Sequence, residues 1–197
     1  MKIKKIIGMT LLAILISSCT PFIEREIGRC DLTEAQMQII PYQMGQVVSF
    51  IDGAGQTVDL TITQNELGWN YDGMASSFHE EYLAYRTKFV TLKSETDNPK
   101  IYLHIFAGES LSGYDNCSLR IGITYSGGFI FNCDTEGNLS NIIGSDIFYH
   151  SLEINGKVYY DVIEQEFIHK DVLTNLLYSK TYGILQIMSD GFFLTLK

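Results

Sequence analysis

The chain has 197 residues, and 46% of them are apolar, which is enough for one globular domain with a sizeable core. It carries 14 lysines and arginines against 23 aspartates and glutamates, so its formal net charge is −9. An acidic protein is repelled by the phosphates of nucleic acids and by anionic lipid head groups. We therefore expect no nucleic-acid partner and no attachment to a membrane through a basic patch.

The first 18 residues have the three parts of an export signal. Lys2, Lys4 and Lys5 precede an apolar stretch over residues 6–16, and two serines follow it. A relaxed bilayer span needs about 20 apolar residues, so this stretch is too short for a permanent membrane helix. A basic start, a short apolar middle and small residues at the end predict a signal peptide over residues 1–18.

The end of this segment is more specific than an ordinary cleavage site. Ile16, Ser17, Ser18 and Cys19 resemble the lipobox of bacterial lipoproteins, in which an aliphatic residue and two small residues precede the cysteine. The resemblance implies that the Cys19 thiol accepts a diacylglyceryl group and that cleavage falls between Ser18 and Cys19. It also implies acylation of the new amino terminus. The alternative is an ordinary secretory signal with an incidental cysteine.

The anchor that this resemblance implies assigns the protein to the cell envelope, with the membrane as partner through the acyl chains on Cys19. Two or more acyl chains hold a protein stably at a membrane, whereas one chain binds only marginally. Thr20 at the next position resembles outer-membrane lipoproteins. Residues 19–36 are mixed and charged without a clear period, and they are interpreted as the lipidated cysteine and a tether, with a short helical turn at 33–37.

Three cysteines remain beyond the predicted cleavage site, namely Cys30, Cys117 and Cys133. An exported chain can form disulfides, but an odd number allows at most one internal pair. A hairpin that turns at residues 126–128 would place Cys133 opposite residue 121, so a direct bridge between Cys117 and Cys133 is not expected. Cys30 pairing with either of them, or three buried thiols, both remain open. No CxxC or Cys/His spacing indicates zinc or redox chemistry.

From residue 46 onward, alternating apolar residues predict strand after strand. The segment 46–64 alternates on both sides of a turn at residues 52–55. In the segment 100–108, one face carries Ile101, Leu103 and Ile105, and the opposite face carries Tyr, His and Phe. Residues 65–80, which include the only tryptophan, are interpreted as a long loop.

Two dipeptides predict the register of later hairpins. Asn155-Gly156 is the leading two-residue hairpin signal because both positions tolerate a positive φ. This turn pairs Leu152 with Tyr159 and His150 with Asp161.

Asp190-Gly191 predicts the last hairpin, in which Met188 pairs with Phe193. Residues 169–180 between these hairpins are compatible with either a short helix or a strand. Turn signals at this spacing predict that residues 37–197 form a single all-β antiparallel domain. Its architecture would be a hairpin-rich sandwich or a curled, partly closed barrel.

The segments "NGKVYYDV" and "YSKTYGILQI…DGFFLTL" are similar to the C-terminal strands of small lipoproteins common in Bacteroidota. This resemblance implies no activity, cofactor or catalytic residue.

Polar motifs that could carry chemistry are incomplete. His79-Glu80-Glu81 lacks the second histidine of a zinc-binding HExxH helix, because Leu83 stands at that position. The stretch 132–138, "NCDTEGN", begins like a calcium loop, but Ile143 replaces the closing acid, and a polar turn is the better interpretation. No metal or cofactor site is therefore predicted.

The pair of His150 and Asp161 resembles part of a catalytic triad, but no nucleophile motif accompanies it, and Ser151 points to the opposite face. A cross-strand polar pair that stabilises the sheet is the better interpretation. No catalytic residue is predicted, and the protein is not expected to be an enzyme.

The aromatic residues of the Asn155-Gly156 hairpin are the most informative feature for function. Phe148 and Tyr159 are predicted on one face, and Tyr149 and Tyr160 on the other. A sheet with one wet face alternates more cleanly, so the pattern indicates either burial on both faces or an apolar cavity.

Two functions follow from this pattern. The first is a structural or protein-interaction lipoprotein that docks an envelope protein through an exposed face or sheet edge. The alternative is a carrier that holds an apolar or amphiphilic, lipid-like ligand against those four aromatics in a β-sheet cavity. The interaction module is preferred because it needs the fewest special residues.

Overall fold

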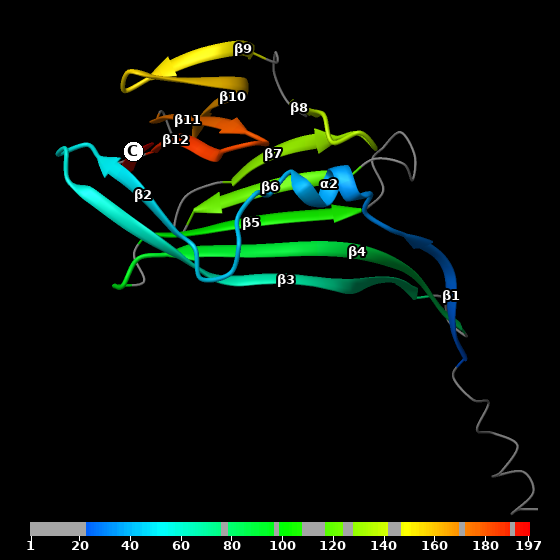
Figure 1. The fold of residues 1–197 in the computed structure, drawn as a ribbon. Helices are drawn as coiled ribbons and strands as arrows, with labels where there is room; N and C mark the ends of the chain where they lie inside the picture. The colour runs from blue at the N-terminus through cyan, green and yellow to red at the C-terminus, as the bar shows by residue number, and fades with distance from the viewer. Residues whose placement is uncertain are drawn as a thin grey trace, which may run out of the picture. The chain divides into compact units, whose positions relative to one another are not determined.

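The structure is a computed structural model, and it describes residues 23–75, 79–96, 99–107, 117–123, 128–141, 147–169, 172–189 and 192–197 (Figure 1). Within these residues it contains thirteen strands and one short helix, α2 (Glu34–Gln38). The strands are β1 (Ile23–Cys30), β2 (Val47–Asp52), β3 (Thr57–Ala75), β4 (His79–Lys93), β5 (Lys100–Ala107), β6 (Cys117–Ile123), β7 (Gly128–Cys133), β8 (Leu139–Asn141), β9 (Ile147–Ile154), β10 (Lys157–His169), β11 (Val172–Ser179), β12 (Gly183–Ser189) and β13 (Phe192–Leu196). The predicted all-β fold is confirmed.

The strands form one antiparallel sheet in the order β8-β7-β6-β5-β4-β3-β2-β13-β12-β11-β10-β9, and β1 pairs with β4 outside this path. Most paired strands follow one another along the chain, and the exceptions are the pairing of β13 with β2 and that of β1 with β4. Within the second unit, Cys30–Asn70 and Tyr85–Lys197, the sheet is strongly curled into a half-barrel, so the second of the two predicted architectures is the one observed.

Contacts divide the chain into two units. The first comprises Met1–Arg29 and Tyr71–Ala84, and the second comprises Cys30–Asn70 and Tyr85–Lys197. In the described part of the first unit, β1 pairs with β4, and the rings of Tyr71 and Tyr82 stand edge to face with centroids 5.4 Å apart. The predicted single domain over residues 37–197 therefore does not coincide with either unit.

The hairpin registers of the second unit follow the turn residues. Asn155 and Gly156 have φ of 54° and 77°, as the predicted turn requires, and Tyr159 pairs with Leu152. Met188 pairs with Phe193, as predicted, although the turn at residues 190–191 lies outside the described residues. Residues 172–179 are strand β11, which decides between the helix and the strand expected there.

The inner face of the half-barrel is filled by the main hydrophobic core. Alternate residues of β5 contribute to it, because Ile101, Leu103 and Ile105 are fully buried, as their alternation predicts. The core joins strands far apart in the sheet, and the rings of Phe131 in β7 and Tyr178 in β11 lie with centroids 6.5 Å apart. On the outer face of β4 and β5, five rings contact one another: Tyr85, Phe89, Tyr102, His104 and Phe106.

Helix α2 packs on the inner face of the sheet, beside β6 and β7 in Figure 1. Thr33 begins the helix with a capping box, in which its hydroxyl accepts from the Gln36 N–H and the Gln36 side chain accepts from the Thr33 N–H. At the other end, Lys88 Nζ donates to the carbonyls of Met37 and Ile40 at 2.8 and 2.9 Å. The short helix predicted at residues 33–37 is therefore confirmed.

Three predictions about the chain's course are wrong. Residues 65–75 continue β3 instead of forming a loop, because pairing with β4 overrides the weak strand preference of their Gly, Asn and Asp. The predicted tether contains strand β1 and the buried residues Leu32 and Gln36. Backbone pairing with β4 holds β1 in the sheet although its sequence shows no clear period.

The third error concerns the cysteines. Cys117 lies directly opposite Cys133 in the register of β6 and β7, in which Ile121 faces Phe129 and not Cys133. Cys133 is a buried thiol whose Sγ donates to the Asp134 carbonyl at 3.2 Å. The side chain of Cys117 lies outside the described residues, as do the predicted signal peptide, Ser18 and Cys19.

Candidate functional site

Tyr159 and Tyr149, two of the four aromatics predicted to face a ligand, belong to a second hydrophobic cluster. Tyr159 is 1% exposed, and its ring stands edge to face with that of Tyr182 at a centroid distance of 5.1 Å. Tyr149 is half-buried against the same cluster. Its hydroxyl donates to Glu164, and this hydrogen bond raises the pKa of Tyr149. The prediction that Tyr149 and Tyr159 lie on opposite faces is therefore wrong.

The backbone at Asp161 explains this error. Asp161 has φ of 52°, a left-handed conformation that only Gly, Asn and Asp adopt with any frequency. It interrupts the alternation of β10, so that Tyr159 and Val162, three residues apart, pack in the same cluster. Strict alternation would have placed these two residues on opposite faces.

Phe148 and Tyr160 are the other two predicted aromatics, and both are largely exposed, at 59% and 53%. Phe148 pairs across the hairpin with Ile163, and both side chains line a pocket of about 260 Å³. The two-faced aromatic pattern thus has two causes. One face is buried in the second cluster, and the other is exposed and borders a pocket.

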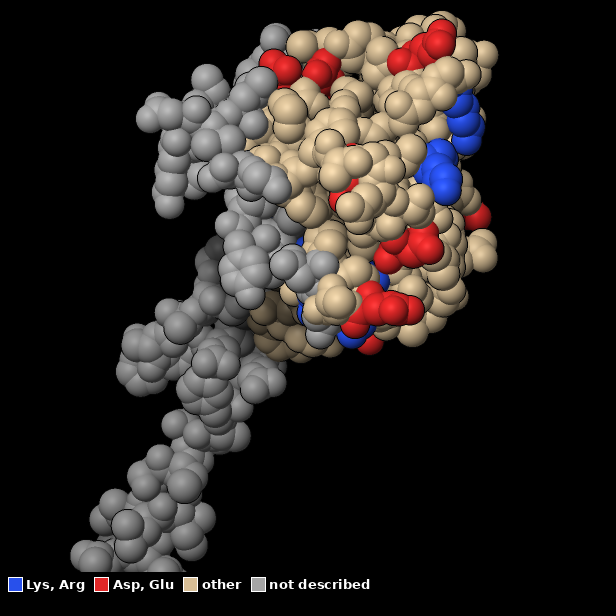
Figure 2. Space-filling model, turned by 90° about the vertical axis from the view of Figure 1, so that its left-hand side faces the viewer, with Lys and Arg blue, Asp and Glu red and all other residues tan. Residues whose placement is uncertain are grey.

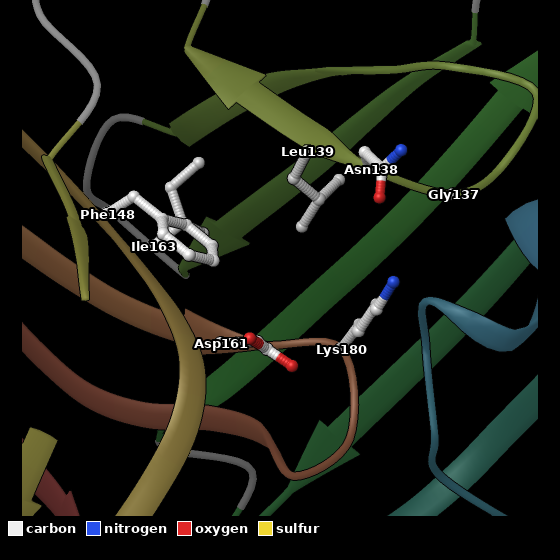
Figure 3. A pocket seen from close by; sticks show the side chains of 7 residues that line it. All are labelled: Gly137, Asn138, Leu139, Phe148, Asp161, Ile163 and Lys180. Carbon is white, nitrogen blue, oxygen red and sulfur yellow. The ribbon is translucent and has the colours of Figure 1, made fainter. Parts of the chain in front are cut away.

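The pocket lies among three segments of the second unit (Figure 3). The turn after β7 and the start of β8 contribute Gly137, Asn138 and Leu139, the β9–β10 hairpin contributes Phe148, Asp161 and Ile163, and the turn after β11 contributes Lys180. In Figure 3 the apolar side chains of Phe148 and Ile163 lie on one side of the pocket, and Lys180 lies on the other. The pocket therefore has an apolar wall and a polar wall.

The turn on the polar side is held by Asp134. Its carboxylate accepts from the backbone N–H groups of Glu136 and Asn138 and from the Asn138 side-chain amide at 2.8–2.9 Å. Burial alone would raise the pKa of Asp134, but these hydrogen bonds and the nearby charge of Lys180 lower it. Residues 132–138 thus include the predicted polar turn, with the Asp134 oxygens occupied by N–H donors.

Of the remaining polar candidates, the structure brings together His150 and Asp161, on the surface of the β9–β10 hairpin. His150 Nδ1 lies 3.9 Å from Asp161 Oδ1 in the predicted register, but the two side chains are 91% and 49% exposed. The side chains of His79, Glu80 and Glu81 lie outside those described, and their backbone begins β4. Among the described residues, no cluster of His, Cys, Asp and Glu could hold a metal ion.

A second, more open hollow of about 650 Å³ lies where the β2–β3 turn meets β12 and β13. Its lining includes Phe192, Phe193 and Met188. Asp52, the charged residue of that lining, uses its carboxylate to accept from the N–H groups of Ala54 and Gln56. The hollow therefore lacks a convergent set of polar groups, and the smaller pocket is the better candidate site.

Sequence reasoning found Phe148 but missed the rest of the pocket. Leu139, Ile163 and Lys180 come from three strands or turns that the curl of the sheet brings together. No local pattern marks such residues. Asn138 belongs to the turn motif seen in the sequence, and Asp161 to the His150 pair, but their shared pocket depends on the tertiary structure.

Within the described part of the chain, no helix is both long enough and apolar enough to cross a bilayer. Comparison with protein-family models, with curated proteins and with solved structures gave no match.

Proposed function

We propose that this protein is a lipid-anchored lipoprotein of the bacterial cell envelope, held in the outer membrane by acyl chains on Cys19. The support for the anchor is the amino-terminal sequence, in which three lysines, a short apolar stretch and Ser17-Ser18-Cys19 follow in order. The support for the compartment is Thr20 after the cysteine.

Replacing Cys19 with serine tests the anchor. Cys19→Ser should abolish both processing that is sensitive to globomycin and incorporation of labelled palmitate, because the acylated thiol is gone. A matched Cys30→Ser variant should keep both. A Cys19→Ser protein that still incorporates palmitate would exclude this anchor.

We further propose that the protein acts as a non-enzymatic interaction module, which pairs the edge of β9 with an extended strand of an envelope protein. The observation that carries this proposal is the exposed apolar surface of one hairpin. Ile147 and Phe148 in β9, and Val158 and Tyr160 in β10, are each 38–59% exposed. Exposed apolar residues that gather on one element indicate an interaction surface more than scattered ones do.

The position of β9 in the sheet supports the choice of partner. β9 ends the strand order, so among the described strands it has only β10 as a neighbour. An edge strand offers N–H and C=O groups to an added strand, and exposed apolar side chains on that edge strengthen the pairing. On the face seen in Figure 2, acidic side chains stand in separate groups with uncharged surface between them.

The carrier alternative has less support. A carrier needs a cavity inside the curled sheet, whereas buried side chains such as Phe50, Phe129 and Phe131 and helix α2 fill the inner face of the described half-barrel. The pocket beside Phe148 is small and partly polar, which does not suit an acyl chain.

Hydrogen exchange of β9 tests the strand-pairing proposal. The anchored protein is measured in isolated outer membranes and after purification in detergent. The β9 amides should exchange more slowly in membranes, while the β2–β3 turn exchanges equally in both. Val158→Lys should remove this protection, and Val47→Lys, a matched exposed valine at 55% exposure, should keep it. Equal exchange of β9 in both preparations would refute the pairing.

A further inference from the structure

The pocket between the β9–β10 hairpin and the turn after β7 shares Phe148 with the proposed docking surface, and its other lining residues play no part in the docking of β9. Leu139, Phe148 and Ile163 form its apolar wall, and Phe148 leaves 59% of its surface exposed there. An exposed aromatic side chain at a pocket gains contact when an apolar group covers it. The apolar wall thus suits a ligand with an apolar or aromatic body.

The polar groups of the pocket carry opposite charges at separate places. Asp161 supplies a carboxylate and Lys180 an ammonium group. In Figure 3 the Lys180 side chain extends toward Asn138 and not toward the Asp161 carboxylate. Among the described residues, no carboxylate oxygen lies within ion-pair distance of Lys180. Its charge acts on Asp134 only from farther away, where it helps to lower the pKa of that carboxyl group.

Asn138 adds a directed acceptor. Its Nδ2 donates to Asp134 Oδ2 at 2.8 Å, and in Figure 3 its oxygen points toward the pocket. The site therefore offers two acceptors, the Asp161 carboxylate and Asn138 Oδ1, and one cationic donor at Lys180. This set matches a ligand that carries both an ammonium and a carboxylate group.

The backbone of Asp161 is the fourth observation. Its φ of 52° is unfavourable for a residue with a Cβ, and conformations of this kind gather at ligand-binding sites. The conformation of this residue breaks the alternation of β10 and leaves the carboxylate at the pocket. Within the described part of the chain, its one ion-pair partner is the largely exposed His150, 3.9 Å away.

We propose that this pocket binds a free α-amino acid with an apolar or aromatic side chain. The ammonium group of the ligand lies at Asp161 and Asn138, its carboxylate lies at Lys180, and its side chain packs on Phe148, Ile163 and Leu139. The volume of about 260 Å³ lies just below the roughly 300–1,000 Å³ of sites for drug-sized ligands, which favours a single amino acid over a lipid or a long peptide. This inference does not rest on the proposed anchor or on pairing at β9.

Charge-deleted ligands test the assignment. L-phenylalanine, N-acetyl-L-phenylalanine and L-phenylalanine amide are titrated into the full-length protein in detergent, and binding is followed by amide chemical shifts and calorimetry. L-phenylalanine should shift the amides of Asn138, Phe148 and Asp161. Each analogue should bind about tenfold more weakly, because each lacks one charged contact.

Two variants assign each charge to its partner. Asp161→Asn should remove the preference for L-phenylalanine over the N-acetyl analogue but keep the preference over the amide. Lys180→Met should remove the preference for L-phenylalanine over the amide but keep the preference over the N-acetyl analogue. Asparagine also tolerates the left-handed conformation, so Asp161→Asn preserves the backbone at this position.

A pair of aromatic variants provides the control for the apolar wall. Phe148→Ala should abolish binding, whereas Tyr160→Ala, at a similarly exposed aromatic outside the pocket, should leave it unchanged. The proposal is overturned if L-phenylalanine gives no shifts up to about 10 mM, a range that covers weak binding. It is also overturned if both analogues bind as well as the free amino acid, or if the shifts do not map to the pocket.

Discussion

The Gln165 side chain links two strands that are not neighbours in the curled sheet, and its removal tests how much this link stabilises the fold. The side chain is 7% exposed, its Oε1 accepts from the Ile130 N–H, and its Nε2 donates to the Ile130 carbonyl, both at 3.1 Å. Gln165 lies in β10 and Ile130 in β7, two strands that are not paired in the sheet. The side-chain amide of Gln165 thus joins β10 to the backbone of β7, where no strand pairing connects them.

Gln165→Leu keeps a side chain of similar size but leaves both backbone groups of Ile130 without this partner. An unsatisfied buried donor or acceptor costs about 1–3 kcal/mol. Ile130 is only half-buried, so water recovers part of this loss. We therefore expect the free energy of unfolding to fall by about 2–4 kcal/mol, which is the lower half of the combined range for two such groups.

Urea denaturation of the full-length protein measures the change, and hydrogen exchange of the Ile130 amide reports it locally. The matched control is Gln186→Leu in β12, because Gln186 is half-buried and donates only to the Thr195 hydroxyl at 3.4 Å. That variant should lose less than about 0.5 kcal/mol. An equal loss of unfolding free energy in both variants, or an unchanged exchange rate of the Ile130 amide, would refute this account of the link between β10 and β7.

Two further predictions concern close packing and pH. Gly183 has φ of 79°, and a Cβ there would clash with the Tyr42 hydroxyl, so Gly183→Ala should lose about 3 kcal/mol of the free energy of unfolding in urea denaturation. Gly45 has φ of 77° but open space around it, so Gly45→Ala should lose about 1 kcal/mol. Similar losses for the two would contradict the packing argument. Burial, aided by the charge of Arg120, lowers the pKa of His104 in the folded protein below its usual 6.5. At a pH between the lowered pKa and 6.5, His104 therefore binds a proton more readily in the unfolded chain than in the folded one. The free energy of unfolding should therefore fall as the pH drops below about 6.5, and His104→Gln should remove that part of the fall; an identical pH dependence in both proteins would contradict it.

The sequence by itself determined the fold class, most strand segments and two registers. These features depend on local physics: the alternation of Ile101, Leu103 and Ile105 requires a strand, and Asn155-Gly156 allows the positive φ of a tight turn. The short helix α2 was predicted because its residues suit a helical turn, and its capping box is also local.

The tertiary structure alone decided the features that depend on pairing between distant segments. Residues 65–75 form a strand because β4 lies beside them, and Cys117 lies opposite Cys133 because of the register in which β6 and β7 pair. One backbone angle at Asp161 placed Tyr159 in a buried cluster.

The candidate pocket depends on the same long-range effect. Its residues come from segments that meet only because the sheet curls, with β7 and β8 near one end of the strand order and β9 and β10 at the other. Sequence patterns report the neighbours of a residue along the chain, whereas curvature arises from the summed twist of many strands and from contacts such as Gln165 with Ile130. The sequence could therefore indicate Phe148 as a possible ligand-facing aromatic, but it could not indicate that Phe148 and Lys180 line the same pocket.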